Sequence, residues 1–116
     1  MSPVNLELLI SSHPQNKKAL RKLQAWLNKR HAAGDITPRE LARNVPVDPS
    51  ELAEALSILV EAGVLQRVYR VLLPGGTLAP REFKDPREIP DQIEDRQEQY
   101  FDTSEADVVP VFKQVA

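Results

Sequence analysis

The chain has 116 residues, a formal net charge of -2 at pH 7, 41% hydrophobic residues and no cysteine. This length is sufficient for one domain with an ordinary core, and the lack of cysteine excludes disulfides, thiolate metal sites and cysteine nucleophiles. The start, MSPVNLELLI, has neither a basic region nor a small-residue cleavage site, and no apolar run approaches the ~18 residues of a membrane span. We therefore expect a cytoplasmic protein without membrane contact.

The small net charge hides a strong segregation along the chain. Residues 1–46 sum to +5, residues 47–66 to -4, residues 67–90 to +2 and residues 91–116 to -5. This alternation is unlike the charge distribution of a uniformly basic nucleic-acid binder.

The first 15 residues allow two predictions. Apolar residues at every second position from Val4 to Ile10 indicate a strand, whereas Ser2 and Pro3 can begin a short helix. We expect an N-terminal strand or arm over residues 1–15, with the strand preferred.

Between Gln15 and Ala33, apolar side chains recur at spacings of three and four, which predicts a helix with one buried side. Gly34 is expected to end this helix, and His31 lies near its C-terminal end, where positive charge is favourable. The cations of this helix lie on its other faces, where they either form a solvated surface or contact phosphate or a partner. The predicted buried side consists of Ala19, Leu20, Leu23, Trp26 and Leu27.

Two capping motifs predict the next two helices. TPRE at residues 37–40 and DPSE at residues 48–51 each place a capping side chain before a proline and a glutamate. Pro46 ends the first of these helices and Gly63 ends the second. The apolar residues of the second, at helical spacing, are Leu52, Ala55, Leu56, Leu59 and Val60.

A β-hairpin is expected after Gly63. VLQRVYRVLL is rich in β-branched and aromatic residues, and PGGT at residues 74–77 supplies a turn before a second extended segment, LAPREF. Pro80 indicates that this second strand lies at an edge or contains a bulge. Gly75 and Gly76 are assigned to the hairpin turn, because neither a helix start nor Lys-Ser/Thr follows them.

The acidic C-terminal extension covers residues 85–116. Pro90 can begin a helix through IEDRQEQYF, and VVPVF at residues 108–112 returns to an extended form, with Pro110 again indicating an edge. Its aromatic content is too high for a purely solvated tail, so we expect docking on the same domain, on a twin copy or on another chain. Its aromatic residues are Tyr100, Phe101 and Phe112.

Three predicted helices followed by a hairpin, with TPRELARNV and then DPSELAEALSILVEAGVLQR, resemble a winged helix-turn-helix domain of the kind found in many bacterial regulators. The resemblance is carried by Glu40-Leu41-Ala42, by the leucines of the third helix and by Gly63-Val64-Leu65. It implies a winged helix domain over residues 16–84, mainly α with a small β-hairpin wing, and an extended C-terminal tail. Members of this superfamily mostly bind DNA, but a sizeable minority join proteins together, and the fold does not choose between these uses.

The inventory for catalysis is thin. His13 and His31 lie in different segments without a nearby carboxylate at helical spacing, and acid pairs such as Glu94 with Glu98 are typical of hydrated helix faces. In the absence of a nucleophile motif, a phosphate loop or a nucleotide fingerprint, we predict a non-enzymatic protein without cofactor or metal.

The third helix favours protein binding over DNA binding. In the DNA-bound use of the fold its exposed face enters the major groove, but here that face carries uncompensated acids, which phosphate repels. We therefore expect a protein-protein adaptor or assembly subunit whose partner is another protein subunit, with a homodimer as a further alternative. The predicted partner-binding residues are Glu51, Glu54, Ile58, Glu61, Tyr100, Phe101 and Phe112.

The alternative is a DNA-binding transcriptional regulator that uses the wing and the first helix for phosphate contacts. Arg67 and Arg70 are separated by an odd number of positions, so a regular strand places them on opposite faces, which weakens a joint basic patch. The nucleic-acid contacts of this alternative are Lys17, Lys18, Arg21, Arg67, Arg70, Arg81 and Lys84.

Overall fold

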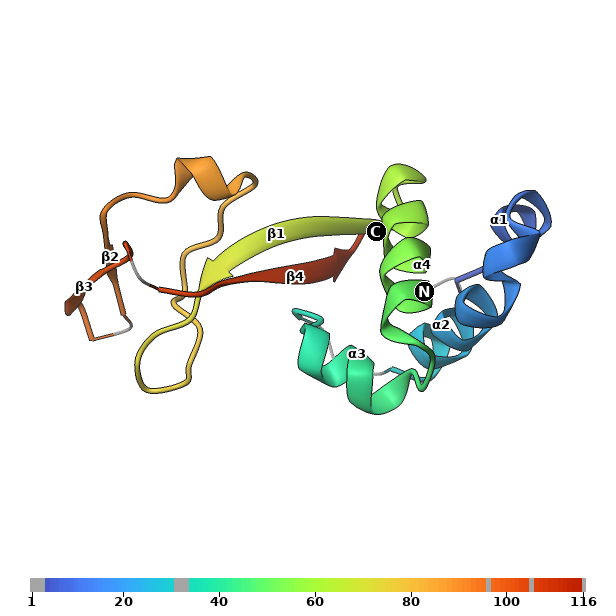
Figure 1. The fold of residues 1–116 in the computed structure, drawn as a ribbon, viewed down its shortest axis with the longest axis horizontal. Coiled ribbons are helices and arrows are strands. Elements are labelled where there is room, and N and C mark those ends of the chain that lie inside the picture. Colours follow the sequence, from blue (N-terminus) through green and yellow to red (C-terminus); the bar gives the residue numbers. More distant parts are fainter. Residues whose placement is uncertain (1–3, 31–33, 96, 105, 116) are drawn as a thin grey trace.

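The computed structural model describes residues 4–30, 34–95, 97–104 and 106–115, which form an α+β fold. Figure 1 shows the helices gathered at one end, with a two-stranded ribbon of β1 and β4 leading from α4 to a distal tip that carries β2 and β3. None of the described helices has the length and apolar character needed to cross a membrane. The elements are α1 (Glu7–Ser12), α2 (Lys17–Lys29), α3 (Pro38–Asn44), α4 (Pro49–Glu61), β1 (Leu65–Val71), β2 (Gln92–Glu94), β3 (Tyr100–Asp102) and β4 (Val108–Gln114), with 3-10 turns at Pro14–Asn16 and Pro86–Glu88.

The N-terminal segment is a helix, so the preferred strand prediction is wrong. Leu6, which directly precedes α1, and Ile10 within it are buried and four residues apart, while Leu8 is 86% exposed. A strand would have placed all three side chains on one face, whereas a helix turns Leu8 away from the core. The alternative start at Ser2 and Pro3 lies outside the described residues.

The main core forms where α1, α2 and α4 meet. The predicted side of α2 is buried, except that Trp26 is only partly so. The helix ends at Lys29, so Gly34 does not terminate it; Gly34 has a φ of 120°, which favours glycine. The predicted helical positions 31–33, including His31, lie outside the described residues.

Both predicted helix starts are present. Thr37 Oγ1 accepts the backbone N–H of Glu40 at 3.2 Å, and the Asp48 carboxylate accepts the backbone N–H of Ser50 at 2.9 Å. The hydroxyl of Ser50, followed by its backbone N–H, holds the pKa of Asp48 below its usual value. The Glu40 carboxylate accepts from Arg30 Nε at 3.4 Å.

The end of α4 follows from Gly63, as predicted. Gly63 has a φ of 78°, and its N–H bonds to the carbonyl of Val60 at 3.1 Å. The N–H of Val64 reaches the carbonyl of Leu59 at 2.9 Å. These two bonds form a Schellman cap, which satisfies the last carbonyls and turns the chain directly into β1.

The regular partner of β1 is β4, which corrects the predicted hairpin. The two strands are antiparallel, from the pair Leu65 and Gln114 to the pair Val71 and Val108. The PGGT turn is present, but LAPREF makes only isolated bridges, from Leu78 to Leu72 and from Phe83 to Tyr69. The two bridges differ in register by two residues, so the segment bulges around Pro80. An edge or a bulge was predicted there because proline has no N–H to donate.

The C-terminal extension docks on its own chain, within the same sheet as β1. Phe112 of β4 also exchanges two backbone hydrogen bonds with Ile36, of 2.8 and 2.9 Å. Pro110 lies opposite Tyr69, whose N–H and carbonyl bond Phe83 on the other side of β1. No ladder bond is therefore lost at Pro110, which explains how a proline fits into this strand.

The helix predicted after Pro90 is wrong, because this segment forms the antiparallel pair β2 and β3. Between these strands, one oxygen of Asp95 accepts the N–H groups of Gln97 and Gln99, at 2.8 and 2.9 Å. Such side-chain bonds compete with helix formation. Glu98 has a φ of 63°, which closes the turn. The buried residues of the tip form a second cluster of Val71, Leu73, Ala79, Phe83 and Ile93.

Candidate interaction surfaces

The exposed side of α4 carries the acids that the sequence indicated. Glu51, Glu54 and Glu61 are exposed, and Glu54 accepts a hydrogen bond from Asn16 Nδ2 at 2.9 Å. Ile58, the predicted apolar anchor, is half-buried and packs against the main core. Part of the Ile58 side chain therefore contacts the core, and the rest is accessible beside the acids.

The aromatic residues of the extension are not brought together with α4. Tyr100 is 65% exposed at the distal tip, where its hydroxyl contacts Glu94, and this hydrogen bond raises the pKa of Tyr100. Phe101 is half-buried and packs against the tip cluster, whereas Phe112 is buried in the main core. The predicted partner residues therefore occupy separate parts of the molecule.

The predicted nucleic-acid contacts are also dispersed. Some of them are exposed cations of α2, whereas Arg81 and Lys84 are exposed in the segment between β1 and β2. The guanidinium of Arg81 lies 5.0 Å from the centre of the Phe83 ring. The exposed cations of α2 include Lys17, Lys18 and Arg21.

Arg67 and Arg70 face opposite sides of the ribbon, as their spacing predicted. Arg70 Nη1 donates to Asp35 Oδ2 at 2.7 Å, and its Nε donates to the carbonyl of Ala79 at 2.8 Å. Lys113 Nζ lies 3.7 Å from the other oxygen of Asp35. The charge of Arg70 is thus neutralised internally, which makes it a structural link rather than a phosphate contact.

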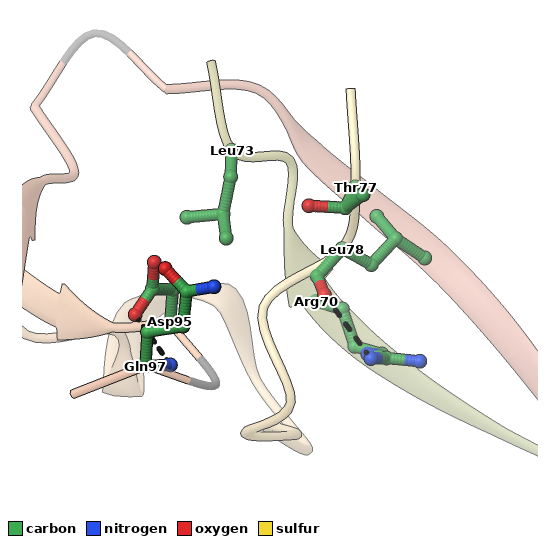
Figure 2. Close-up of a pocket in the computed structure, with 6 residues that line it drawn as sticks. All are labelled: Arg70, Leu73, Thr77, Leu78, Asp95 and Gln97. Carbon is green, nitrogen blue, oxygen red and sulfur yellow. Dashed lines mark hydrogen bonds between the residues drawn. The ribbon is translucent and has the colours of Figure 1, made fainter. Parts of the chain in front are cut away.

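A hollow of about 550 Å³ lies in the tip beside Arg70 (Figure 2). Its charged groups are already engaged, because Arg70 binds Asp35 and two carbonyls while Asp95 accepts the N–H groups of its own turn. Among the described residues, Arg70 is neutralised by Asp35, whereas Asp95 is held by the N–H groups of its own turn and has no cation within ion-pair distance. It is lined by Arg70, Leu73, Thr77, Leu78, Asp95 and Gln97.

A second hollow is lined mainly by apolar side chains, and we call it the apolar groove. It has a volume of about 460 Å³ and lies between α3, α4 and one face of the ribbon. It could not be predicted from the sequence, because the groove needs β4 beside β1 and opposite α3. It is lined by Pro38, Leu41, Ala42, Pro49, Leu52, Ala53, Leu56, Ser57, Arg67, Tyr69, Pro110 and Phe112.

Arg67 brings the charge of the apolar groove. Its guanidinium lies 5.5 Å from the centre of the Phe112 ring, a cation–π contact between neighbouring strands. Among the residues that the structure describes, no carboxylate lies within ion-pair distance of Arg67. The groove therefore combines an apolar floor with one half-buried cation that lacks an anionic partner in the described part of the chain.

Nothing in the described ranges brings three or more histidine or acidic side chains close enough to hold a metal ion. Comparison with protein families, with curated proteins and with solved structures finds no match to this chain.

Proposed function

We propose that this chain is a non-enzymatic winged-helix adaptor that joins other proteins through the apolar groove. Three helices, α2 to α4, precede β1 in the order that the winged helix resemblance implies, but the regular partner of β1 is β4 and not the adjacent segment assigned to the wing. On this proposal the ribbon is an enlarged wing, and residues 72–107 are an insertion at its end.

The apolar groove is the observation that carries the proposal. Three of its lining side chains, Leu52, Tyr69 and Pro110, are only partly buried by the chain itself. Concave surfaces with apolar walls and a few polar groups are typical of binding sites. Covering these side chains would remove more apolar surface from water, which favours association with a partner.

Charge supports a protein partner over DNA. Glu51, Glu54 and Glu61 remain exposed on the helix that would enter the major groove, so phosphates would be repelled there. Arg70 is bound to Asp35, which removes one of the cations of the DNA-binding alternative. The remaining cations of that alternative lie on α2, on β1 and in the segment between β1 and β2.

Site-specific crosslinking in the source cells tests the proposal. A photo-reactive residue at Ala53, which is exposed and lines the groove, should give a discrete protein adduct. The same residue at Ala25, an exposed alanine of α2 outside the groove, is the matched control and should give none. Ala42→Arg, which fills the groove from α3, should abolish the adduct while the melting temperature stays unchanged. Equal adducts at both positions would contradict the proposal.

Duplex DNA of random sequence tests the alternative. We expect no salt-dependent change of fluorescence anisotropy when the chain is added at low salt. Micromolar binding that weakens steeply with salt, and that is lost in the double variant Arg67→Ala and Arg81→Ala, would favour the DNA-binding regulator instead.

A further inference from the structure

We infer that the apolar groove binds an acidic amphipathic segment of a partner protein, with apolar side chains on its floor and an Asp or Glu carboxylate on Arg67. This inference rests on the proposed protein-binding function and specifies the chemistry of the partner.

The two arginines of β1 differ in whether a carboxylate matches their charge. Arg70 points to one face of the ribbon and has Asp35 at 2.7 Å. Arg67 points to the other face, lines the groove and rests on Phe112 without a carboxylate among the described residues. Arg70 is therefore neutralised within the chain, whereas no described carboxylate neutralises the charge of Arg67.

Covering the groove has an electrostatic consequence. A partner that covers Leu52 and Tyr69 also takes water away from Arg67, because these side chains line the same hollow. Burial of a cation without an anionic partner is unfavourable, whereas a carboxylate forms strong charge-assisted hydrogen bonds with a guanidinium. The partner segment should therefore place an acid next to its apolar anchors.

The backbone of the ribbon limits the way in which such a segment binds. On the outer edge of β4, Phe112 is bonded to Ile36 and Pro110 has no N–H to offer. On the outer edge of β1, Tyr69 exchanges both backbone bonds with Phe83. Strand addition is thus blocked at these positions, and the segment is held by side chains, as an amphipathic helix is held in a groove.

Peptide selection tests directly whether a segment that binds the groove needs an acid beside its apolar side chains. Random peptides displayed on phage are selected on the intact chain and, in parallel, on Arg67→Glu. Wild-type selection should enrich apolar anchors with an Asp or Glu, and selection on Arg67→Glu should replace that acid by Lys or Arg while retaining the anchors. Enriched groove-binding peptides without an acid would overturn the inference.

Affinity measurements on the best selected peptide complete the test. Arg67→Gln should weaken binding about tenfold or more, because one charge-assisted contact is lost. Arg81→Gln is the matched control, since Arg81 also lies over a phenylalanine but outside the groove, and it should leave the affinity unchanged. Equal losses in both variants would overturn the assignment of Arg67.

Failure of the proposed protein-binding function and failure of the inferred partner segment would give different results. If no selected peptide is blocked by Ala42→Arg, the groove is not a protein-binding site and the proposed function itself fails. If sedimentation reveals a dimer of the chain that Ala42→Arg dissociates, the occupant is a second copy, and the inferred partner segment is wrong. Thermal melts of each variant verify that the fold is retained.

Discussion

The helical end, residues 4–64, and the tip, residues 72–107, are stabilised in different ways. In the helical end, amphipathic helices bury leucines such as Leu20, Leu23 and Leu59 in one continuous core. The tip has a smaller cluster, and its other contacts are side-chain caps of turns and three-residue strands. Apolar burial is the larger stabilising contribution, so the tip depends on the ribbon for its order.

An ion pair from each region also differs in its exposure to water and in the sequence separation of its partners. In the helical end, the Arg30 side chain is 7% exposed where it meets Glu40, ten residues away. In the tip, Arg87 pairs with Asp85 two residues earlier, and the Arg87 side chain is 90% exposed. Exposed local pairs contribute little to stability, whereas a shielded pair between distant residues holds elements together. We expect the tip to open before the helical end unfolds.

The largest expected effect comes from the core of the helical end. Leu59→Ala removes a fully buried side chain of α4 and should lower the free energy of unfolding by about 3 kcal/mol. Urea denaturation followed by circular dichroism measures this loss. A loss below about 1 kcal/mol would mean that the packing around α4 relaxes far more than a close-packed core normally does.

The link between the two regions should give the next effect. Arg70→Met removes three hydrogen bonds that join Asp35 to the 78–79 segment, and should cost about 2 kcal/mol because Asp35 is partly shielded. Lys113→Met is the comparison: it removes the ion pairs of Lys113 to Glu82 and to the other oxygen of Asp35, but the Lys113 side chain is 37% exposed, so the loss should be smaller, about 1 kcal/mol or less. Urea denaturation of both variants measures the difference. Equal losses would show that Asp35 does not depend on Arg70 in particular.

A core substitution in the tip should affect that region alone. Ile93→Ala should make the amide of Thr103 exchange faster, because this N–H bonds Asp91 across the tip. The free energy of global unfolding should fall by only about 1 kcal/mol or less, since the tip opens first. Hydrogen exchange with mass spectrometry distinguishes the regions. Faster exchange throughout α2 and α4 would instead indicate one cooperative unit.

The smallest expected effect is an acid sensitivity of the tip. The backbone N–H of Ser104 lowers the pKa of Asp102, and the Arg87 side chain lowers that of Asp85. Such groups stabilise the folded state above their unfolded pKa, near 3.8, and this contribution is lost as pH falls through the lower folded value.

Amide exchange of Ser104, followed by NMR during acidification, measures this loss. Asp102→Asn keeps an acceptor but does not titrate, and should make Ser104 less sensitive to acid. A wild-type Ser104 that stays equally protected below the folded pKa of Asp102 would contradict the expected contribution.

The helices could be predicted because their signals are local. The caps at Thr37 and Asp48 and the stop at Gly63 act within one helical turn, and the burial of α4 follows its 3.6-residue period. The N-terminal segment was predicted wrongly because its local signal is ambiguous. Six residues fit both periods, and only packing against α2 decided that Leu6 and Ile10 share a face.

The candidate site depended on contacts between distant residues. The sequence indicated an acidic α4 and opposite faces for Arg67 and Arg70, and both features are present. It missed the apolar groove, because a strand near residue 110 carries no signal that names residue 69 as its partner. Strand pairing can join any two extended segments, so the choice between LAPREF and β4 was made by the whole fold.

The sequence by itself determined where α3 and α4 begin and end, which sides of α2 and α4 are apolar, and how charge alternates along the chain. The tertiary structure decided that the C-terminal segment completes the ribbon, that Arg70 is neutralised by Asp35, and that Arg67 remains beside an apolar hollow. The reason is physical: capping and helical periodicity act over a few residues, whereas strand pairing and ion pairing join residues that only the folded chain brings together.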